Sequence, residues 1–161
     1  MQIRNMAITD YETVYKMWFD SPGIGVMSVD DSKESIRVFL ERNPDTCLVA
    51  VDGDRAIGVI MCGFDGRRAY IYHFIVDSDH RGQKVGTTLI EMLIMRLEAM
   101  HVNKVALVAF SKNEKANEFW KAQGFKERAD LNYMDHQINA ENIWLNKDIV
   151  LKSYSADPSR R

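Results

Sequence analysis

The residues between 76 and 87, which read VDSDHRGQKVGT, combine glycines with basic side chains at a change of hydrophobic pattern. The pattern predicts a strand that ends near Val76 and a helix that begins at residues 86–87. The first turn of a helix leaves about four backbone N–H groups unpaired, and the helix dipole makes that end positive. Glycine lets a ligand approach the backbone closely, and Arg81 and Lys84 add charge. These residues therefore favour a diphosphate-binding turn.

Two other phosphate-binding motifs do not fit this turn. It lacks the G-x-x-x-x-G-K-[ST] spacing of a P-loop and the G-x-G-x-x-G spacing of a dinucleotide fingerprint. A glycine-rich turn between a strand and a helix also serves close packing, and on these residues alone that alternative stays open.

The composition is that of a globular domain, with 161 residues of which 46% are hydrophobic and 27% charged. A chain of this length buries a full core without the help of a disulfide or a structural metal, so Cys47 and Cys62 are expected to be buried, reduced thiols. A net charge of −2 predicts no general affinity for nucleic acid or anionic lipid. The histidines show no metal-ligand spacing, so we expect no metal. The sequence shows no leader-like or membrane-spanning run, and we expect a cytoplasmic protein.

Hydrophobic periodicity and turn residues predict the element order β-α-α-β-β-β-α-β-α-β, with room for one more strand. A T-x-x-E capping box at Thr9 starts the first helix, and paired Asp-Gly turns join the central strands into an antiparallel meander. The strands at 68–76 and 104–110 should be parallel, because a helix connects them. Residues 125–138 are expected to return as one or two strands. The predicted fold is a single α/β (α+β) domain with a mixed sheet of six or seven strands flanked by four helices.

Two motifs at this separation resemble those of the GCN5-related N-acetyltransferases. Residues 81–86 are similar to the family's R-x-x-G-x-G/A motif, and Asn113 followed by a helix that ends at Gly124-Phe125 is similar to its later signature. The likeness covers residues 1–138, which we expect to form the acetyltransferase domain. Residues 139–161 are then a C-terminal extension whose end is expected to be disordered.

The resemblance implies acetyl-CoA as the donor substrate. In the family pattern the two parallel strands splay apart and leave backbone N–H groups to hold the pantetheine arm, while the helix start takes the diphosphate. The residues that this implies for coenzyme A binding are Phe74, Ile75, Val76, Arg81, Gly82, Gln83, Lys84, Val85, Gly86, Thr87, Asn113 and Trp120.

The implied activity is transfer of the acetyl group to a primary amine of a small molecule or a protein, by direct attack in a ternary complex. The Val76 amide is placed to stabilise the developing oxyanion. The acceptor must first lose a proton, and the residues in the 68–76 strand that can accept it are His73 and Tyr72. The loop at residues 21–28 is expected to wall the acceptor pocket. The oligomeric state stays open, and a homodimer through the apolar residues 143–145 is one alternative.

Three departures from the family pattern keep alternatives open. The third motif position, usually glycine, is Lys84, which requires a backbone without positive φ there. A tyrosine acid of the later helix is replaced by Trp120, and the 68–76 strand contains no carboxylate. His73 also fits a packed strand histidine. The alternative to an active enzyme is a regulatory or catalytically degenerate module that binds coenzyme A.

Overall fold

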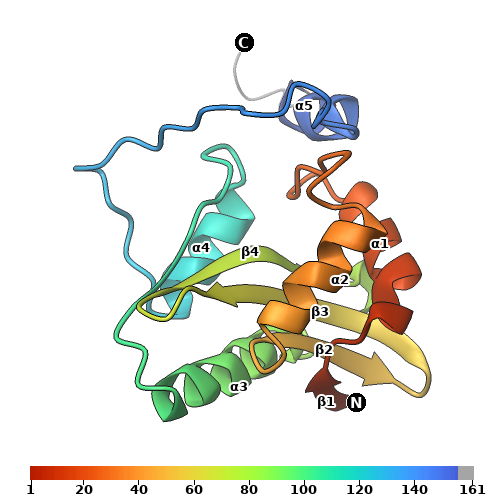
Figure 1. Ribbon diagram of the computed structural model, residues 1–161, viewed down its shortest axis with the longest axis vertical. Helices are drawn as coiled ribbons and strands as arrows, with labels where there is room; N and C mark the ends of the chain where they lie inside the picture. The colour runs from red at the N-terminus through yellow and green to blue at the C-terminus, as the bar shows by residue number, and fades with distance from the viewer. Residues whose placement is uncertain (156–161) are drawn as a thin grey trace.

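The computed structural model describes residues 1–155, which form one mixed sheet with helices on both faces (Figure 1). Its five strands lie in the order β1-β2-β3-β4-β5; the first four are antiparallel to their neighbours and β5 is parallel to β4. The strands are β1 (Gln2–Asn5), β2 (Cys47–Asp52), β3 (Arg55–Phe64), β4 (Ala69–Val76) and β5 (Val105–Leu107). The α-helices are α1 (Tyr11–Phe19), α2 (Lys33–Arg42), α3 (Val85–Ala99), α4 (Glu114–Ala122) and α5 (Lys147–Ser155).

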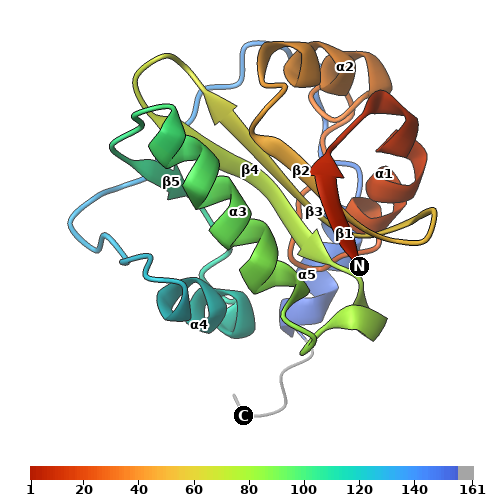
Figure 2. The same ribbon diagram turned by 90° about the horizontal axis from the view of Figure 1, so that it is seen from below.

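Two cores lie on opposite faces of the sheet because the central strands alternate apolar residues on both sides. Val49 and Val59 join the core beneath α1 and α2, whereas their neighbours Leu48 and Ile60 join the core beneath α3. Figure 2 shows α1 and α2 on one side of the sheet and α3 on the other. This two-sided burial explains why β2 and β3 read as nearly continuous apolar runs. Cys47 and Cys62 are buried and unbridged, as expected.

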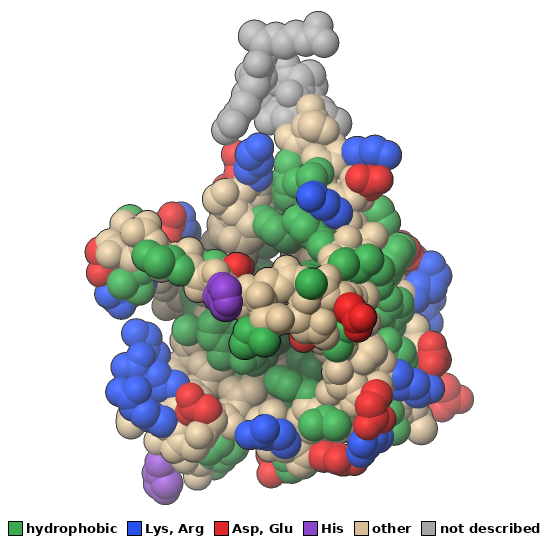
Figure 3. Space-filling view, turned by 45° about the horizontal axis from the view of Figure 1, so that its top comes forward, with side chains coloured by type: hydrophobic (Ala, Val, Ile, Leu, Met, Phe, Trp, Pro, Cys, Tyr) green, Lys and Arg blue, Asp and Glu red, His purple; other side chains and the backbone are tan. Residues whose placement is uncertain are grey.

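The predicted fold class is confirmed, but within residues 1–155 the sheet has five strands. The prediction of strands at 125–138 was wrong, because that segment runs as irregular chain. Its apolar side chains are separated by charged residues and bury no common face: Leu131, Tyr133, Met134 and Ile138 are all exposed. In the space-filling view, hydrophobic side chains line the hollow left beside this segment (Figure 3).

Helix starts also differ in detail from the sequence prediction. A 3₁₀ turn at Ile8–Asp10 precedes α1, and the Asp10 carboxylate accepts the Ala7 N–H at 2.8 Å in place of the expected Thr9 capping box. Ser32 caps α2 by accepting the Ser35 N–H, and Asn113 caps α4. The cap of the first helix therefore lies one or two residues from its expected position, which is the usual uncertainty at helix ends.

The parallel strands diverge part-way along β4. Their pairing ends at Ile71↔Leu107, so the second half of β4 has no β5 partner. A bulge lies at the same level, because Met61 faces His73 while Cys62 faces Ile71, which leaves Tyr72 as the extra residue. The expected splayed pair is therefore present.

The C-terminal extension packs back onto the domain, with α5 next to the loop between α1 and α2 (Figure 1). The predicted disorder of its end concerns residues 156–161, which lie outside the described residues. In the described part of the chain, none of the helices has the length and apolar character needed to cross a membrane.

Candidate active site

The turn that leads into α3 presents a row of unpaired backbone N–H groups. Within residues 1–155, none of the amides from Gly82 to Thr87 donates a hydrogen bond to the protein. Those in the first helical turn are unpaired because no helical carbonyl precedes them. The dipole of the 15-residue helix adds positive potential at the same place. We call the amides of residues 82–87 the anion cradle.

Lys84 adopts a left-handed backbone directly before α3, with φ 63° and ψ 9°. The expectation that this position avoids positive φ was therefore wrong. A left-handed residue followed by right-handed helical residues turns successive N–H groups toward one point, which forms an anion-binding nest. Gly82, two positions earlier, also has positive φ, 75°. The turn thus uses a conformation that costs an L-residue about 1–2 kcal/mol, and it does so where the amides converge.

Positive side chains flank the anion cradle, while the nearby carboxylate of Asp77 is already engaged. Arg81 and Lys84 are both exposed beside the cradle. Asp77 pairs with Arg55 at 2.6 Å and accepts the Asp79 N–H at 3.0 Å. The local field at the helix start therefore favours an anion such as a diphosphate.

Gly86 is required by packing as well as by any ligand. A Cβ built on it would lie 3.0 Å from Phe74 Cζ, 3.2 Å from Phe119 Cζ and 3.4 Å from Val76 Cγ2. The Phe74 and Phe119 rings are stacked with centroids 5.4 Å apart, so neither has room to move aside. Glycine at this position lets α3 sit against the end of β4, and that contact fixes the anion cradle beside the splayed strands.

The unpaired half of β4 ends in a cavity next to the cradle. A cavity of about 670 Å³ lies between α1 and the end of β4, and Ile75, Val76, Asp77 and Arg81 are among the residues that line it. The Val76 carbonyl accepts a hydrogen bond from Arg81 Nε at 3.3 Å, which ties the strand end to the basic side chain. The end of β4 and Arg81, which directly precedes the anion cradle in the chain, therefore line the same cavity.

His73 is paired with a carboxylate from another element. Its Nε2 lies 2.6 Å from Asp31 Oδ1, and its ring packs on Trp18 with centroids 4.6 Å apart. Asp31 is 5% exposed and is held in place by the Met27 N–H, which its other oxygen accepts at 2.7 Å. Asp31 was not predicted as a site residue, because nothing in its local sequence distinguishes it from a helix-capping aspartate.

The sequence from residue 11 to residue 125 matches the model of the acetyltransferase (GNAT) family. The chain belongs to this family. An acetyltransferase of Sodalis glossinidius (strain morsitans) is 31% identical over 114 residues, which cover 71% of this chain and 79% of that protein. N-alpha-acetyltransferase 30 of Homo sapiens is 30% identical over 117 residues, which cover 68% of this chain and 32% of that protein.

The fold is also that of solved GNAT structures. The PaiA N-acetyltransferase from Thermoplasma acidophilum, solved in complex with coenzyme A, superposes with a TM-score of 0.70 at 18% identity, covering 88% of this chain and 94% of that one. As a GNAT family member the protein is an acetyl-CoA-dependent N-acetyltransferase, as the sequence predicted. In the described residues, no group of three His, Cys, Asp or Glu side chains is arranged to hold a metal ion.

The remaining candidate residues of this GNAT protein lie in three different surroundings. Tyr72 is 59% exposed and presents its ring edge-on to Phe39 of α2. Trp120 is buried among Phe74, Phe119 and Phe125, in the core beneath α3. Asn113 caps α4 by accepting the Ala116 N–H at 3.2 Å, and its amide lies close to Gly23 of the loop between α1 and α2.

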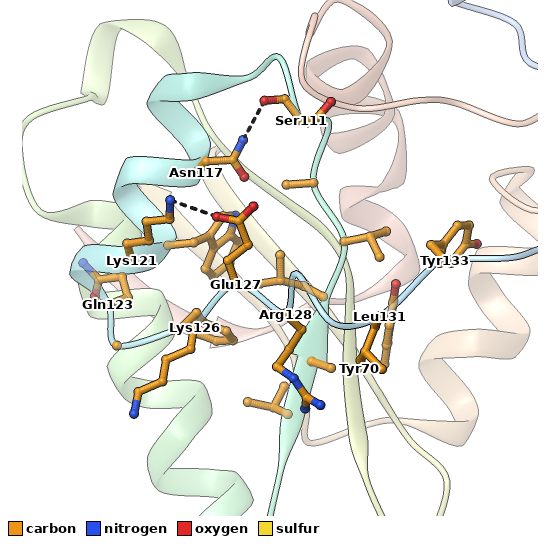
Figure 4. Close-up of a pocket in the computed structure, with 18 of the residues that line it drawn as sticks. Tyr70, Ser111, Asn117, Lys121, Gln123, Lys126, Glu127, Arg128, Leu131 and Tyr133 are labelled. Atoms are coloured by element: carbon orange, nitrogen blue, oxygen red, sulfur yellow. Dashed lines mark hydrogen bonds and ion pairs between the residues drawn. The ribbon is translucent and has the colours of Figure 1, made fainter.

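A second and larger hollow follows the free edge of β5. It has a volume of about 1100 Å³ and lies between β5, α4 and the irregular segment after Phe125. Figure 4 shows Leu131 beside Tyr70, and Tyr133 further along the same segment. Burial raises the pKa of Tyr70, and the neighbouring Tyr133 and Tyr72 act in the same direction. Tyr70 therefore stays a neutral phenol at physiological pH.

Proposed function

We propose that the protein transfers the acetyl group of acetyl-CoA to a primary amine of a small molecule or a protein, by direct attack in a ternary complex. The observation that carries this proposal is the anion cradle at the end of a splayed strand. The cradle amides, with Arg81 and Lys84, would hold the diphosphate. The unpaired half of β4 would hold the pantetheine arm by strand-like hydrogen bonds. That arrangement would direct the thioester toward the β4 bulge, next to which His73 lies.

Direct attack is favoured because the described residues offer no accessible thiol for a covalent intermediate. Cys47 and Cys62 are buried in the two cores, and burial raises the pKa of each thiol to about 12. Almost none of either thiol is ionised near neutral pH, and the thiolate is the nucleophilic form. A thioester is already activated, so alignment of the amine and removal of its proton supply most of the catalysis.

We propose that His73, oriented by Asp31, accepts the proton of the attacking amine. A carboxylate bonded to one imidazole nitrogen fixes the tautomer and the orientation of the ring. The other ring nitrogen is then the acceptor. The Val76 amide would stabilise the oxyanion, and exposed Tyr72 would contact the acceptor beside the bulge.

The proposed acceptor is inferred from relatives of the protein. N-alpha-acetyltransferase 30 of Homo sapiens, by its name, acetylates α-amino groups. A peptide α-amine is therefore our first candidate acceptor, with small primary amines as the second. For the assembly we propose a homodimer, because Ile143 and Leu145 keep 55% and 42% of their surfaces exposed.

Two measurements test the proposed function. Acetyl-CoA at 100 times its Kd should stabilise the native protein by about 2.7 kcal/mol, which is readable as a rise in Tm. Release of free coenzyme A should follow addition of a primary amine, and initial rates with both substrates varied should give intersecting reciprocal plots. If acetyl-CoA stabilises the protein but none of the primary amines tested is acetylated, the protein is a coenzyme A-binding module without catalysis. Parallel reciprocal plots would refute direct attack.

The proton acceptor is tested by paired variants. His73→Gln and Asp31→Asn should each lower kcat by roughly 10²–10⁴-fold, which is the usual contribution of a general base. The Kd for coenzyme A should be unchanged. His101→Gln, an exposed histidine after α3, is the matched control and should keep full activity. Wild-type kcat in both His73→Gln and Asp31→Asn would remove the pair from the mechanism.

A further inference from the structure

The loop between α1 and α2 is held by a strand-like segment from the far end of the chain. Residues 24–30 of this loop run beside residues 141–146, with an isolated antiparallel bridge between Met27 and Trp144. The backbone contributes Ser28 N–H to Ile143 O at 2.8 Å and Leu145 N–H to Val26 O at 2.8 Å. We call residues 141–146 the clasp. Figure 1 shows the chain crossing from α4 to reach this loop before α5 begins.

Asn146 is the most deeply buried polar residue of the clasp, and both the oxygen and the nitrogen of its side-chain amide are hydrogen-bonded. Its Oδ1 accepts the Val26 N–H and the Trp144 Nε1–H, both at 2.9 Å. Its Nδ2 donates to Ile24 O at 2.8 Å and Phe19 O at 3.1 Å. Asn146 is 2% exposed, so these partners would lack any replacement if its side chain were removed.

Exposed members of the clasp repeat the pattern at the other end of the loop. The Asn142 Oδ1 accepts the N–H groups of Val29 and Asp30, and its Nδ2 donates to the Asp30 carboxylate at 2.7 Å. The Ser28 hydroxyl donates to Glu141 O and accepts the Ile143 N–H. The clasp therefore binds residues 24–30 of the loop through both backbone and side-chain hydrogen bonds.

The loop that the clasp holds leads directly to Asp31. Met27, which pairs with Trp144, also donates its N–H to the Asp31 carboxylate, whose other oxygen contacts His73. At the other side, Trp144 stacks on Phe110, in the chain that leaves β5 at the splay. A Cβ on Gly25 would lie 3.2 Å from Trp144 Nε1, so the loop backbone lies directly against the indole. The clasp thus connects the loop, the splay and the His73–Asp31 pair.

We propose that the clasp sets the acceptor side of the acetyl-transfer site, and that Asn146 is its positioning residue. This inference rests on the proposed function, because it assigns the loop as the wall against which the amine is placed. Asn146 touches neither substrate. It acts by fixing residues 24–30, and through them the orientation of Asp31 toward His73. The anion cradle lies in the turn before α3 and in its first helical turn, and among the described residues no hydrogen bond joins it to the clasp.

The test compares Asn146→Ala with the milder pair Ser28→Ala and Ser28→Thr. Asn146→Ala should raise the acceptor KM and lower kcat, together reducing kcat/KM at least tenfold, while the Kd for coenzyme A stays within twofold of wild type. Ser28→Ala should show a smaller loss that Ser28→Thr, which retains the hydroxyl, restores. Asn103→Ala is the matched control, because Asn103 is an exposed asparagine after α3 that belongs to neither segment.

Hydrogen exchange of residues 24–31 reads the clasp without any acceptor. Faster exchange of this loop in Asn146→Ala, and not in Asn103→Ala, is the expected result. Unchanged exchange would overturn the clasp, as would a freed loop with wild-type acceptor kinetics or a parallel loss of coenzyme A affinity. Absence of acetyl transfer in the wild-type protein would count against the proposed function, and the exchange result alone would then decide whether residues 141–146 hold the loop.

Discussion

Replacing Lys84 with glycine separates backbone strain from charge at the anion cradle. Lys84 has φ 63°, and a left-handed backbone costs an L-residue about 1–2 kcal/mol that glycine does not incur. Glycine also gains unfolded-state entropy, which offsets about 0.5–1 kcal/mol of this relief. We therefore expect Lys84→Gly to raise the free energy of unfolding by about 0.5–1 kcal/mol, although it removes a charged side chain from a surface turn.

The same substitution should weaken coenzyme A binding. The Lys84 ammonium is exposed, and an exposed ion pair contributes at most about 1 kcal/mol, so the Kd should rise by roughly two- to fivefold. Lys84→Ala removes the same charge but keeps the strained backbone. The two variants should therefore share one coenzyme A affinity and differ in stability, as measured by isothermal titration and urea unfolding.

His101 supplies the matched control for strain. It is the other non-glycine residue with positive φ among residues 1–155, at 58°, and it lies beyond the end of α3, a helix length from the anion cradle. His101→Gly should raise stability by a similar amount and leave coenzyme A binding unchanged. Equal stability of Lys84→Gly and Lys84→Ala would refute the strain argument, and unchanged affinity in both would remove the ammonium from the diphosphate site.

Two further predictions concern the core. Gly86→Ala should lower the free energy of unfolding by about 1 kcal/mol, because overpacking against Phe74 and Phe119 outweighs the better helix propensity of alanine. In urea unfolding, the double variant Gly86→Ala/Phe119→Leu should lose less stability than the sum of the two single variants. A stabilised Gly86→Ala would contradict the close packing. For the thiols, a folded pKa of about 12 lies above the unfolded value of 9.0, so stability is intact below pH 9 and falls as the pH rises toward 12. Each thiol should contribute a loss of about 1.4 kcal/mol per pH unit in that range, and a Cys47→Ala/Cys62→Ala variant should lose stability less steeply.

The anion cradle could be predicted from the sequence because all its parts are contiguous. One strand end, one glycine turn and one helix start within residues 76–87 supply the amides, the dipole and the charge. The left-handed conformation of Lys84 was not predictable in this way, because lysine has no preference for it and the surrounding turn imposes it. A lysine at position 84 therefore indicated a negative φ, whereas the structure has a positive one.

Parts of the site that depend on distant contacts were not predictable. The partner of His73 is 42 positions away at Asp31, and the partner of the Val26 amide is 120 positions away at Asn146. Neither side chain belongs to a motif, and a buried asparagine looks like a surface residue until its partners are known. The strand prediction for the segment after Phe125 was wrong for the opposite reason. Its residues have some strand pattern, but no neighbouring face of the protein buries them.

Donor binding and acceptor binding are built from different kinds of structure in this protein. The anion cradle depends on the first turn of α3 and on a glycine contact with β4, so changes at the termini should leave it intact. The proposed acceptor wall depends on a loop whose hydrogen bonds go to the other end of the chain. Because these bonds use the side chains of Ser28, Asn142 and Asn146, a few substitutions in either segment would reshape the wall without disturbing the cradle. A fold arranged in this way keeps one donor while its acceptor changes, which is why the donor is the part of the function that sequence resemblance establishes first.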